Sequence, residues 1–357
     1  MTFSWKKALM LGASLLALGA CGQGQTEQNQ QEAKKGDQQA LTVYTNSLDD
    51  EKEDWLAKRS KDAGFDVQFV KAGGGDTFNR IMAEKNDPQA DVIIGLDEGQ
   101  LKQIKEADLL AEFEPSWAND IPDNLKTGGK YYYPWTEQRI MAFYRTDQVK
   151  DAPKKLEDFA KIPELEKKYA VPADMAGSTN QKIVFSILLQ HLDKEGELGV
   201  SKEGWQAVKD YFDHGYVPTE GEDRHAKMGQ GDLLASYYFS GGIPNVEKEF
   251  EFQATPVNPD YGVFSMSEQV AVVKKDDDSK LATAKKYADW WGSKETQEAW
   301  AKDFGTVPTL KSAQDAVAPR IKEIMTATDR MDVDWDIINE YADQWVEKIE
   351  LDLLPAQ

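Results

Sequence analysis

Apolar and polar positions alternate in short, regular stretches along the first part of the chain. Apolar and polar residues alternate in 41–46 (LTVYTN) and in 64–70 (GFDVQFV), which predicts a strand in each segment. Residues 90–95 (ADVIIG) are a continuous apolar run, typical of a strand buried on both faces. The intervening residues 51–64 and 78–85 have the spacing of amphipathic helices. The order strand, helix, strand, helix, strand predicts a parallel sheet covered by helices.

The rest of the chain has further helical patterns and one clear strand. Helices are predicted at 101–110, 182–192, 203–215, 280–305 and 332–351, and a strand at 268–275 (EQVAVVKK). The segment 280–305 should be two helices broken near Gly292, with Ser293 as the N-cap of the second helix.

The N-terminus has the pattern of an export signal. Lys6 and Lys7 precede an apolar run, 8–20, that is too short to span a bilayer as a helix. The run ends in Leu-Gly-Ala-Cys and resembles a bacterial lipobox, which implies cleavage after residue 20 and lipid attachment to Cys21. Residues 22–40 contain no aromatic and no large aliphatic residue, so we expect residues 21–40 to be a lipidated cysteine and a flexible tether.

Composition narrows the class of protein. The formal net charge of −21 argues against nucleic acid as a partner. Cys21 is the only cysteine, so an internal disulfide is impossible and stability depends on the core. The length from residue 41 to residue 357 favours two lobes over one.

Three consecutive glycines stand between the second predicted strand and the next helix. Gly73, Gly74, Gly75, Asp76 and Thr77 would lie at the carboxyl edge of the sheet, where open α/β sheets bind ligands. Free N–H groups at a helix start can hold an anion. No Gly-Lys-Ser/Thr follows, so this is not a nucleotide-binding P-loop. The alternative is a tight turn with Asp76 or Thr77 as the N-cap.

A second loop of this kind is AGSTNQKIVFSILL (176–189). Gly177, Ser178 and Thr179 precede the predicted helix, and Asn180 and Gln181 add hydrogen-bond donors. A capping sequence is again the alternative, because Ser and Thr are favoured there.

Several segments together are similar to the lipid-anchored solute-binding proteins of bacterial ABC importers. The resemblance is to the group that includes ferric-ion, aminoethylphosphonate, sugar-phosphate and thiamine binders. The segments that carry it are LTVYTN, AGGGDTFNRIMAEKNDPQADVIIG, LLASYYFSGGIPN, EQVAVVKK, KKYADWWGSKETQEAW and FGTVPT.

This resemblance implies an α/β, two-lobe periplasmic-binding-protein-like clamshell of type II. Each lobe would be a largely parallel sheet flanked by helices, with crossing strands as the hinge. Lobe one would comprise 41–138 plus 263–310, and lobe two 139–262 plus 311–357. The ligand would lie in the cleft between the lobes, contacted by the Gly177 loop from lobe two, and hinge closure would present it to permease subunits.

The resemblance also points to a third candidate loop. Ferric-binding relatives carry adjacent tyrosines where Tyr237 and Tyr238 stand, followed here by Ser240 and Gly241. Phenolate oxygen suits Fe(III), but neighbours in a strand face opposite sides, so both tyrosines could bind one metal only if the strand ends there. Otherwise one tyrosine belongs to the core and the other lines an organic-ligand pocket.

Two departures weaken the ferric interpretation. Leu48 stands where many ferric binders have a histidine, and Asp97 and Glu98 are displaced from the position of their glutamate. A phosphate- or phosphonate-bearing anion fits the two glycine loops as well as iron does. Thiamine-like cations are a third, less favoured class of ligand. For an anion, the possible donors are Arg80, Arg139 and Arg145.

A lipid-anchored hydrolase or a ligand sensor is the alternative class. The sequence has neither Gly-x-Ser-x-Gly nor His-Glu-x-x-His. We therefore expect a monomeric binding protein without a cofactor or enzymatic activity. It would be exported and anchored by lipid at the outer face of the cytoplasmic membrane, or in the periplasm or outer membrane of a two-membrane source.

Overall fold

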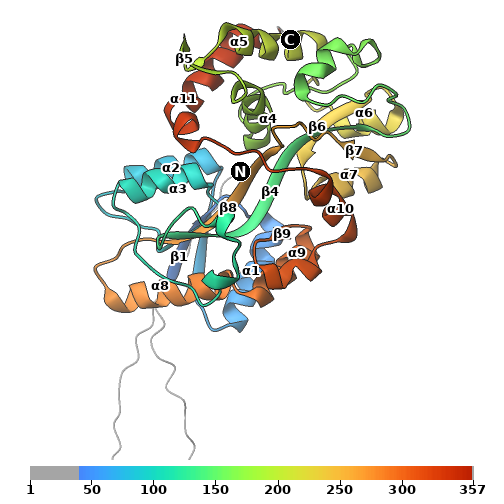
Figure 1. The fold of residues 1–357 in the computed structure, drawn as a ribbon. Coiled ribbons are helices and arrows are strands. Elements are labelled where there is room, and N and C mark those ends of the chain that lie inside the picture. Colours follow the sequence, from blue (N-terminus) through green and yellow to red (C-terminus); the bar gives the residue numbers. More distant parts are fainter. Residues whose placement is uncertain (1–39, 356–357) are drawn as a thin grey trace, which may run out of the picture. The chain divides into compact units, whose positions relative to one another are not determined.

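The computed structural model describes residues 40–355 (Figure 1). The predicted signal peptide 1–20, the lipidation site Cys21 and residues 22–39 of the predicted tether lie outside the described residues. Within residues 40–355, no helix is both long and apolar enough to cross a bilayer.

One mixed sheet organises the structure, with the strand order β2-β1-β3-β8-β4-β6. β7 and β9 pair with β4 outside this path, and β5 lies apart from the sheet. The strand bounds are β1 Leu41–Thr45, β2 Val67–Lys71, β3 Val92–Ile94, β4 Tyr132–Arg145, β5 Leu192–Glu197, β6 Ala235–Phe239, β7 Ala254–Pro256, β8 Phe264–Val272 and β9 Val307–Pro308.

Strand direction divides the sheet into two parts. β1 pairs in parallel with β2 and β3, as the sequence predicts. β8 pairs antiparallel with β3 and β4, and β6, β7 and β9 pair antiparallel with β4. The expectation of a largely parallel sheet in each lobe is therefore wrong beyond β3. The chain runs out along β4 and returns along β8, so these two long strands must be antiparallel (Figure 1).

Helices cover the sheet on both sides of the β4–β8 pair (Figure 1). Their bounds are α1 Asp50–Asp62, α2 Gly74–Ala83, α3 Glu98–Glu106, α4 Ser178–Leu188, α5 Lys202–His214, α6 Arg224–Gln230, α7 Ile243–Glu249, α8 Asp278–Trp291, α9 Lys294–Phe304, α10 Pro319–Ala327 and α11 Trp335–Lys348. Ser293 caps α9 through the N–H of Thr296, which confirms the predicted break at Gly292.

Two large apolar cores lie at opposite ends of the β4–β8 pair. One collects side chains of α4, α5 and α11, where the rings of Phe185 and Trp345 are 5.2 Å apart. The other collects side chains of β1, α8 and α9. At its centre Trp300 contacts Trp55, Trp135 and Trp291, with ring centroids 5.3, 5.5 and 5.3 Å away.

The distinctive segment AEKNDPQADVIIG anchors β1. Asp91 is fully buried, accepts a hydrogen bond from the backbone N–H of Thr42 at 2.8 Å, and pairs with Lys275 and Lys280 at 3.3 and 3.1 Å. Glu84 accepts from the hydroxyl of Tyr44 at 3.0 Å. The segment therefore holds the sheet together and does not line a cavity.

Candidate functional site

Two of the three glycines, Gly74 and Gly75, lie inside a helix, and Gly73 caps its start. α2 begins at Gly74, and Gly73 is the N-cap, so the interpretation of Asp76 or Thr77 as the N-cap is wrong. A Cβ on Gly74 would stand 3.1 Å from Nδ2 of Asn46, which means that the glycine lets the loop after β1 approach the backbone. No side chain caps this helix start, so its first N–H groups remain available.

The other residues of this loop differ in exposure. Gly75 and Asp76 are exposed, and Thr77 is buried with its hydroxyl donating to the carbonyl of Ala72 at 3.4 Å. None of Gly73–Thr77 lines either of the two cavities described below.

The second glycine loop begins α4 in the same way. Gly177 is the N-cap without a side-chain hydrogen bond, and Ser178 and Thr179 lie in the first helical turn. Ser178 Oγ accepts from Lys182 Nζ at 2.8 Å, and the same Nζ is 3.2 Å from Asp97 Oδ2 at the start of α3. The starts of α3 and α4 are thus joined by an ion pair between two largely buried side chains.

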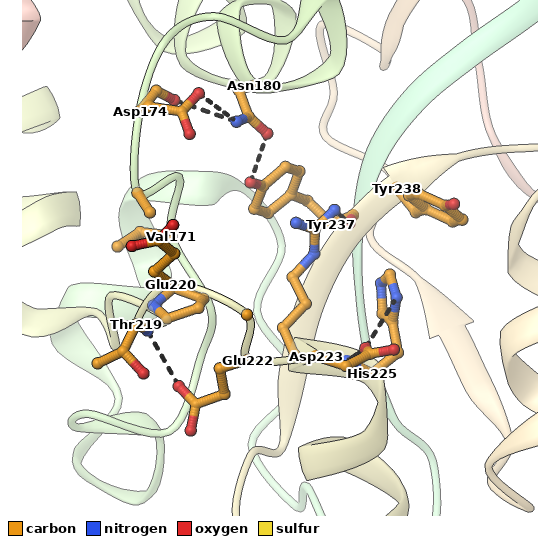
Figure 2. A pocket seen from close by; sticks show the side chains of 14 residues that line it. Val171, Asp174, Asn180, Thr219, Glu220, Glu222, Asp223, His225, Tyr237 and Tyr238 are labelled. Carbon is orange, nitrogen blue, oxygen red and sulfur yellow. Dashed lines mark hydrogen bonds and ion pairs between the residues drawn. The ribbon is translucent and has the colours of Figure 1, made fainter. Parts of the chain in front are cut away.

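Beside α4 lies a cavity of about 710 Å³ that we call the tyrosine cavity (Figure 2). Its lining residues are Val171, Ala173, Asp174, Asn180, Tyr237, Tyr238 and residues 218–225. The structure therefore brings both predicted tyrosines together with Asn180, but leaves Gly177, Ser178 and Thr179 outside the lining.

The two tyrosines point in different directions. Tyr237 is buried and donates its hydroxyl to Asn180 Oδ1 at 2.7 Å, while Tyr238 packs against His225 with ring centroids 4.7 Å apart. Figure 2 shows the two hydroxyls directed away from each other. Burial raises the pKa of Tyr237 to about 12, so at neutral pH this group is a neutral hydrogen-bond donor.

Arg224 is the one Arg or Lys side chain among the residues that line this cavity, and it has no counterion among the described residues. Its guanidinium lies over the rings of Tyr237 and Tyr238, at 4.3 and 5.7 Å from their centroids. Its Nε is buried without a hydrogen-bond partner, and one terminal nitrogen reaches the carbonyl of Tyr237 at 3.5 Å. Among residues 40–355, no carboxylate forms an ion pair with it.

Four acidic side chains line the wall, and three of them, all but Glu220, are already engaged. Asp174 accepts from the N–H of Ala176, Asp223 caps α6, and Glu222 pairs with Lys227 at 2.7 Å. The adjoining His225 is buried, and burial lowers its pKa to about 4, so it stays neutral. The unpaired positive charge of the cavity therefore belongs to Arg224.

A second cavity, of about 670 Å³, lies against the β4–β8 pair, and we call it the hinge cavity. Gln138, Glu268, Ser47, Phe239 and Gly241 line it, together with the end of α9. Ser47 Oγ donates to Glu268 Oε2 at 2.6 Å, and burial raises the pKa of Glu268 to about 7. Oε1 of Gln138 is buried without a partner.

The remaining predicted residues have structural contacts. Gly241 meets Gly305 so closely that a Cβ on it would lie 2.6 Å from the Gly305 carbonyl oxygen. Ser240 is fully buried and its Oγ accepts from the N–H of Arg139 at 3.2 Å. Arg80 pairs with Glu84.

Two further arginines predicted as ligand donors are also committed elsewhere. Arg139 pairs with Glu137 at 2.9 Å, and Arg145 pairs with Asp147 at 2.8 Å. Neither lines a cavity, whereas the sequence reasoning missed Arg224, which does. Arg224 stands in no motif, and only its place directly after the helix-capping Asp223 distinguishes it.

A metal site of the common kind is not formed. In the part of the chain that the structure describes, no cluster of three or more His, Cys, Asp or Glu side chains could hold a metal ion. Leu48 packs at the edge of the core under β1, Asp97 caps α3, and Glu98 accepts from the N–H of Ser267.

Comparison with known proteins assigns these features to one family. The sequence profile described as bacterial extracellular solute-binding protein matches residues 54–327. A probable ABC transporter periplasmic-binding protein of Sinorhizobium fredii is 30% identical over 315 residues, covering 88% of this chain and 86% of the relative. A putative 2-aminoethylphosphonate-binding periplasmic protein of Salmonella typhimurium is 29% identical over 123 residues, 33% of this chain and 35% of that protein.

Solved structures share the fold at low sequence identity. Iron-bound HitA of Pseudomonas aeruginosa has a TM-score of 0.69 at 18% identity, covering 88% of this chain and 99% of HitA. Apo ferric ion-binding protein A of Pasteurella haemolytica has a TM-score of 0.70 at 17% identity, covering 87% and 96%. The predicted α/β fold of two lobes, of the type II periplasmic-binding kind, is thereby confirmed.

Proposed function

The chain belongs to the family of bacterial extracellular solute-binding proteins, and from this premise we propose that it binds a small solute through a phosphate or phosphonate group in the tyrosine cavity. It is the solute-binding component of an ABC transporter. The two lobes would close around the solute and present it to the permease, without chemical change of the solute.

The unpaired guanidinium of Arg224 is the observation that carries the proposal. A guanidinium without a counterion is stabilised by an anion that accepts two hydrogen bonds from it. A phosphate or phosphonate group offers that geometry. The hydroxyl of Tyr237 already donates to Asn180 Oδ1 at 2.7 Å, and the Asn180 amide donates to the carbonyl of Asp174 at 3.1 Å, so each would have to leave its present acceptor to donate to the bound group.

Two further features support an oxyanion. α4 begins next to this cavity without a side-chain cap, so its positive end and free N–H groups favour negative charge. The Salmonella relative is named for a phosphonate, although the similarity covers only a third of each chain.

Ferric iron is the second candidate, because both tyrosines line the cavity and several proteins of the same fold are ferric binders. Their divergent hydroxyls disfavour one shared metal ion (Figure 2). Fe(III) would also have to remove a proton from a phenol whose pKa burial has raised to about 12 and break its hydrogen bond to Asn180.

Isothermal titration calorimetry decides between the two. The chain without residues 1–37 is suitable, because residues 38–357 cluster as one compact unit. The probes are inorganic phosphate, 2-aminoethylphosphonate, glucose 6-phosphate and ferric citrate. We expect at least one phosphorus oxyanion to bind, and the substitution Arg224→Gln to weaken that binding by roughly 10- to 150-fold, since charged hydrogen bonds contribute about 1.5–3 kcal/mol.

The matched control is Arg59→Gln on α1, which removes an arginine outside both cavities and should leave affinity unchanged. A coloured ferric complex that is lost in Tyr237→Phe and insensitive to Arg224→Gln would overturn the oxyanion in favour of iron. Turnover of any bound probe would contradict a binding protein and favour the hydrolase alternative.

Three parts of the proposal rest on the sequence. The lobe boundaries at 138/139, 262/263 and 310/311 follow the family resemblance. Lipidation of Cys21 would anchor the protein at the membrane, and mass spectrometry of the native N-terminus tests it. We further propose that the protein is a monomer, which light scattering of the soluble chain tests.

A further inference from the structure

The start of α3 touches two other helices, α4 and α11. Asp97 pairs with Lys182 of α4, and the carbonyl of Gly99 accepts a hydrogen bond from Asn339 Nδ2 of α11 at 3.1 Å. One turn later Lys102 pairs with Asp336, also of α11. α4 and α11 share one apolar core, while α3 packs in another with β3 and β8. These contacts therefore form a seam between the two sides of the molecule, which we call the α3 seam.

Glu98 is enclosed in this seam. Glu98 is only 6% exposed, and its Oε1 accepts a hydrogen bond from the backbone N–H of Ser267 on β8 at 2.9 Å. Its other oxygen, Oε2, is buried and has no hydrogen-bond partner. Beside it, a Cβ on Gly99 would stand 2.8 Å from the ring of Trp335, so α11 closes tightly over this turn.

The charges around Glu98 do not compensate it. Asp97, on its own element, repels a carboxylate at this place. Arg330, from the segment before α11, attracts it but is already paired with Glu137 of β4 at 2.8 Å. Tyr132 of β4 contributes only a neutral phenol, because burial raises its pKa to about 12. Lys182 and Lys102 each have a carboxylate of their own at the seam.

We propose that Glu98 is a positioning residue for lobe closure, which takes up a proton on this carboxyl each time the α3 seam forms. This rests on the closure step of the proposed function, and it names a control of that step. With the proton in place, Oε2 becomes a neutral hydroxyl that tolerates enclosure. Without the proton, an uncompensated charge would be sealed against β8 and α11.

The direction of the pH effect follows from burial. In the closed form burial raises the pKa of Glu98 to about 8, whereas an open seam exposes the carboxyl to water, where its ordinary pKa is about 4.5. Closure is then easiest below pH 4.5 and becomes harder as pH rises toward 8. Ligand affinity should fall by up to about tenfold per pH unit across that window and level off above it.

The test compares the chain without residues 1–37 with its Glu98→Gln variant, in which the amide keeps the shape and can still accept from Ser267. Affinity for 2-aminoethylphosphonate is measured from pH 6 to pH 9, and the ratio of the two dissociation constants is taken at each pH so that titration of the probe cancels. We expect the ratio of wild-type to variant dissociation constants to rise at least tenfold from pH 6 to pH 8.

The control is Glu106→Gln at the exposed end of the same helix, for which the ratio should be flat. A flat ratio for Glu98→Gln as well would overturn the inference.

A second readout needs no ligand. Amide hydrogen exchange of residues 97–102, corrected for intrinsic rates, should lose protection with rising pH in the wild-type chain and not in Glu98→Gln. If 2-aminoethylphosphonate does not bind but this difference is present, the choice of ligand fails and the Glu98 inference stands. If the exchange profiles of the two chains coincide, the Glu98 inference fails whatever the ligand is.

Discussion

A buried carboxylate lies near each end of β3, and the two differ in how far their surroundings compensate a negative charge. Asp91, just before the strand, faces two lysines and a backbone N–H. Glu98, four residues after the strand, has one backbone donor, an unpartnered oxygen and a neighbouring acid. The first arrangement stabilises an ion. In the second arrangement nothing offsets the cost of burying the charge, so the protonation state of Glu98 depends on whether the carboxyl is enclosed.

Because of this difference, we expect the contacts of Asp91 to be permanent and those of Glu98 to form and break. Both partners of Asp91 lie after β8, and β8 pairs with β3 directly, so its contacts remain whether or not the lobes move. Glu98 lies where α3 meets α11, and under the proposal above it is enclosed only while that contact exists. The comparison can be tested by removing each charge in turn.

The largest effect is expected for Asp91→Asn. The substitution leaves Lys275 and Lys280 without their shared counterion, and breaking a fully buried pair costs about 3–5 kcal/mol. The lysine side chains keep 14% and 29% exposure, so we expect a loss of about 2–4 kcal/mol in the free energy of unfolding by urea denaturation. The exposed Asp62→Asn is the control. A loss as small as that of the control would mean that the lysines are adequately solvated and that Asp91 is no support.

Glu98→Gln should act through pH. The native pKa of about 8 lies above the ordinary 4.5, so the folded chain binds the extra proton and its stability is lost as pH rises between these values. One proton corresponds to at most about 1.4 kcal/mol per pH unit. Unfolding curves at pH 6 and pH 8 should therefore show a smaller decline for the Gln variant than for the wild-type chain. Parallel declines would place Glu98 in the same class as Asp91.

Glu84→Gln tests whether the whole segment before β3 is structural. Its carboxylate accepts from Tyr44 and pairs with Arg80, and its side chain is 21% exposed. We expect a loss of about 1.5–2 kcal/mol in the free energy of unfolding, at the lower end of the roughly 1.5–3 kcal/mol that hydrogen bonds to a charged group contribute, because the carboxylate is partly exposed. Calorimetric affinity for the phosphorus oxyanions should be unchanged, and a weaker affinity would tie this segment to ligand binding.

The smallest effect belongs to Lys102→Ala at the outer edge of the α3 seam. Its ion pair with Asp336 has both partners well exposed, at 39% and 71%, where solvent screens the attraction. The free energy of unfolding should not change measurably in urea denaturation at 0.15 M salt. A clear loss of stability would show that the exposed Lys102–Asp336 pair, and not the enclosed Glu98, holds the α3 seam together.

Residue pattern predicts the parts of the fold that depend on local sequence. The strands before 110 and the cap at Ser293 follow from periodicity and capping chemistry, whereas the long strand β4 was not predicted from the residue pattern. The start of α2 was missed because glycine disfavours helix, yet Gly74 is needed in the first turn for the approach of Asn46. Antiparallel pairing beyond β3 depends on the path of β4 and β8, which no local pattern encodes.

The candidate site could be predicted only in part, because it too depends on contacts between residues far apart in the sequence. Tyr237 and Tyr238 line a cavity, but their divergence appears only once His225 and Asn180 are placed around β6. Arg224 gains its importance from contacts with residues 13 and 14 positions along the chain, and from the lack of a counterion. Such absences are properties of three-dimensional packing and leave no trace in a motif.

The contact of Trp300 with three other tryptophans also makes this region optically distinctive. Indole rings about 5 Å apart couple their electronic transitions, and Trp300 and Phe304 line the hinge cavity as well. A solute that enters this cavity would disturb the coupling directly. The protein therefore contains its own chromophore for occupation of the hinge cavity, readable in near-ultraviolet circular dichroism without any added label.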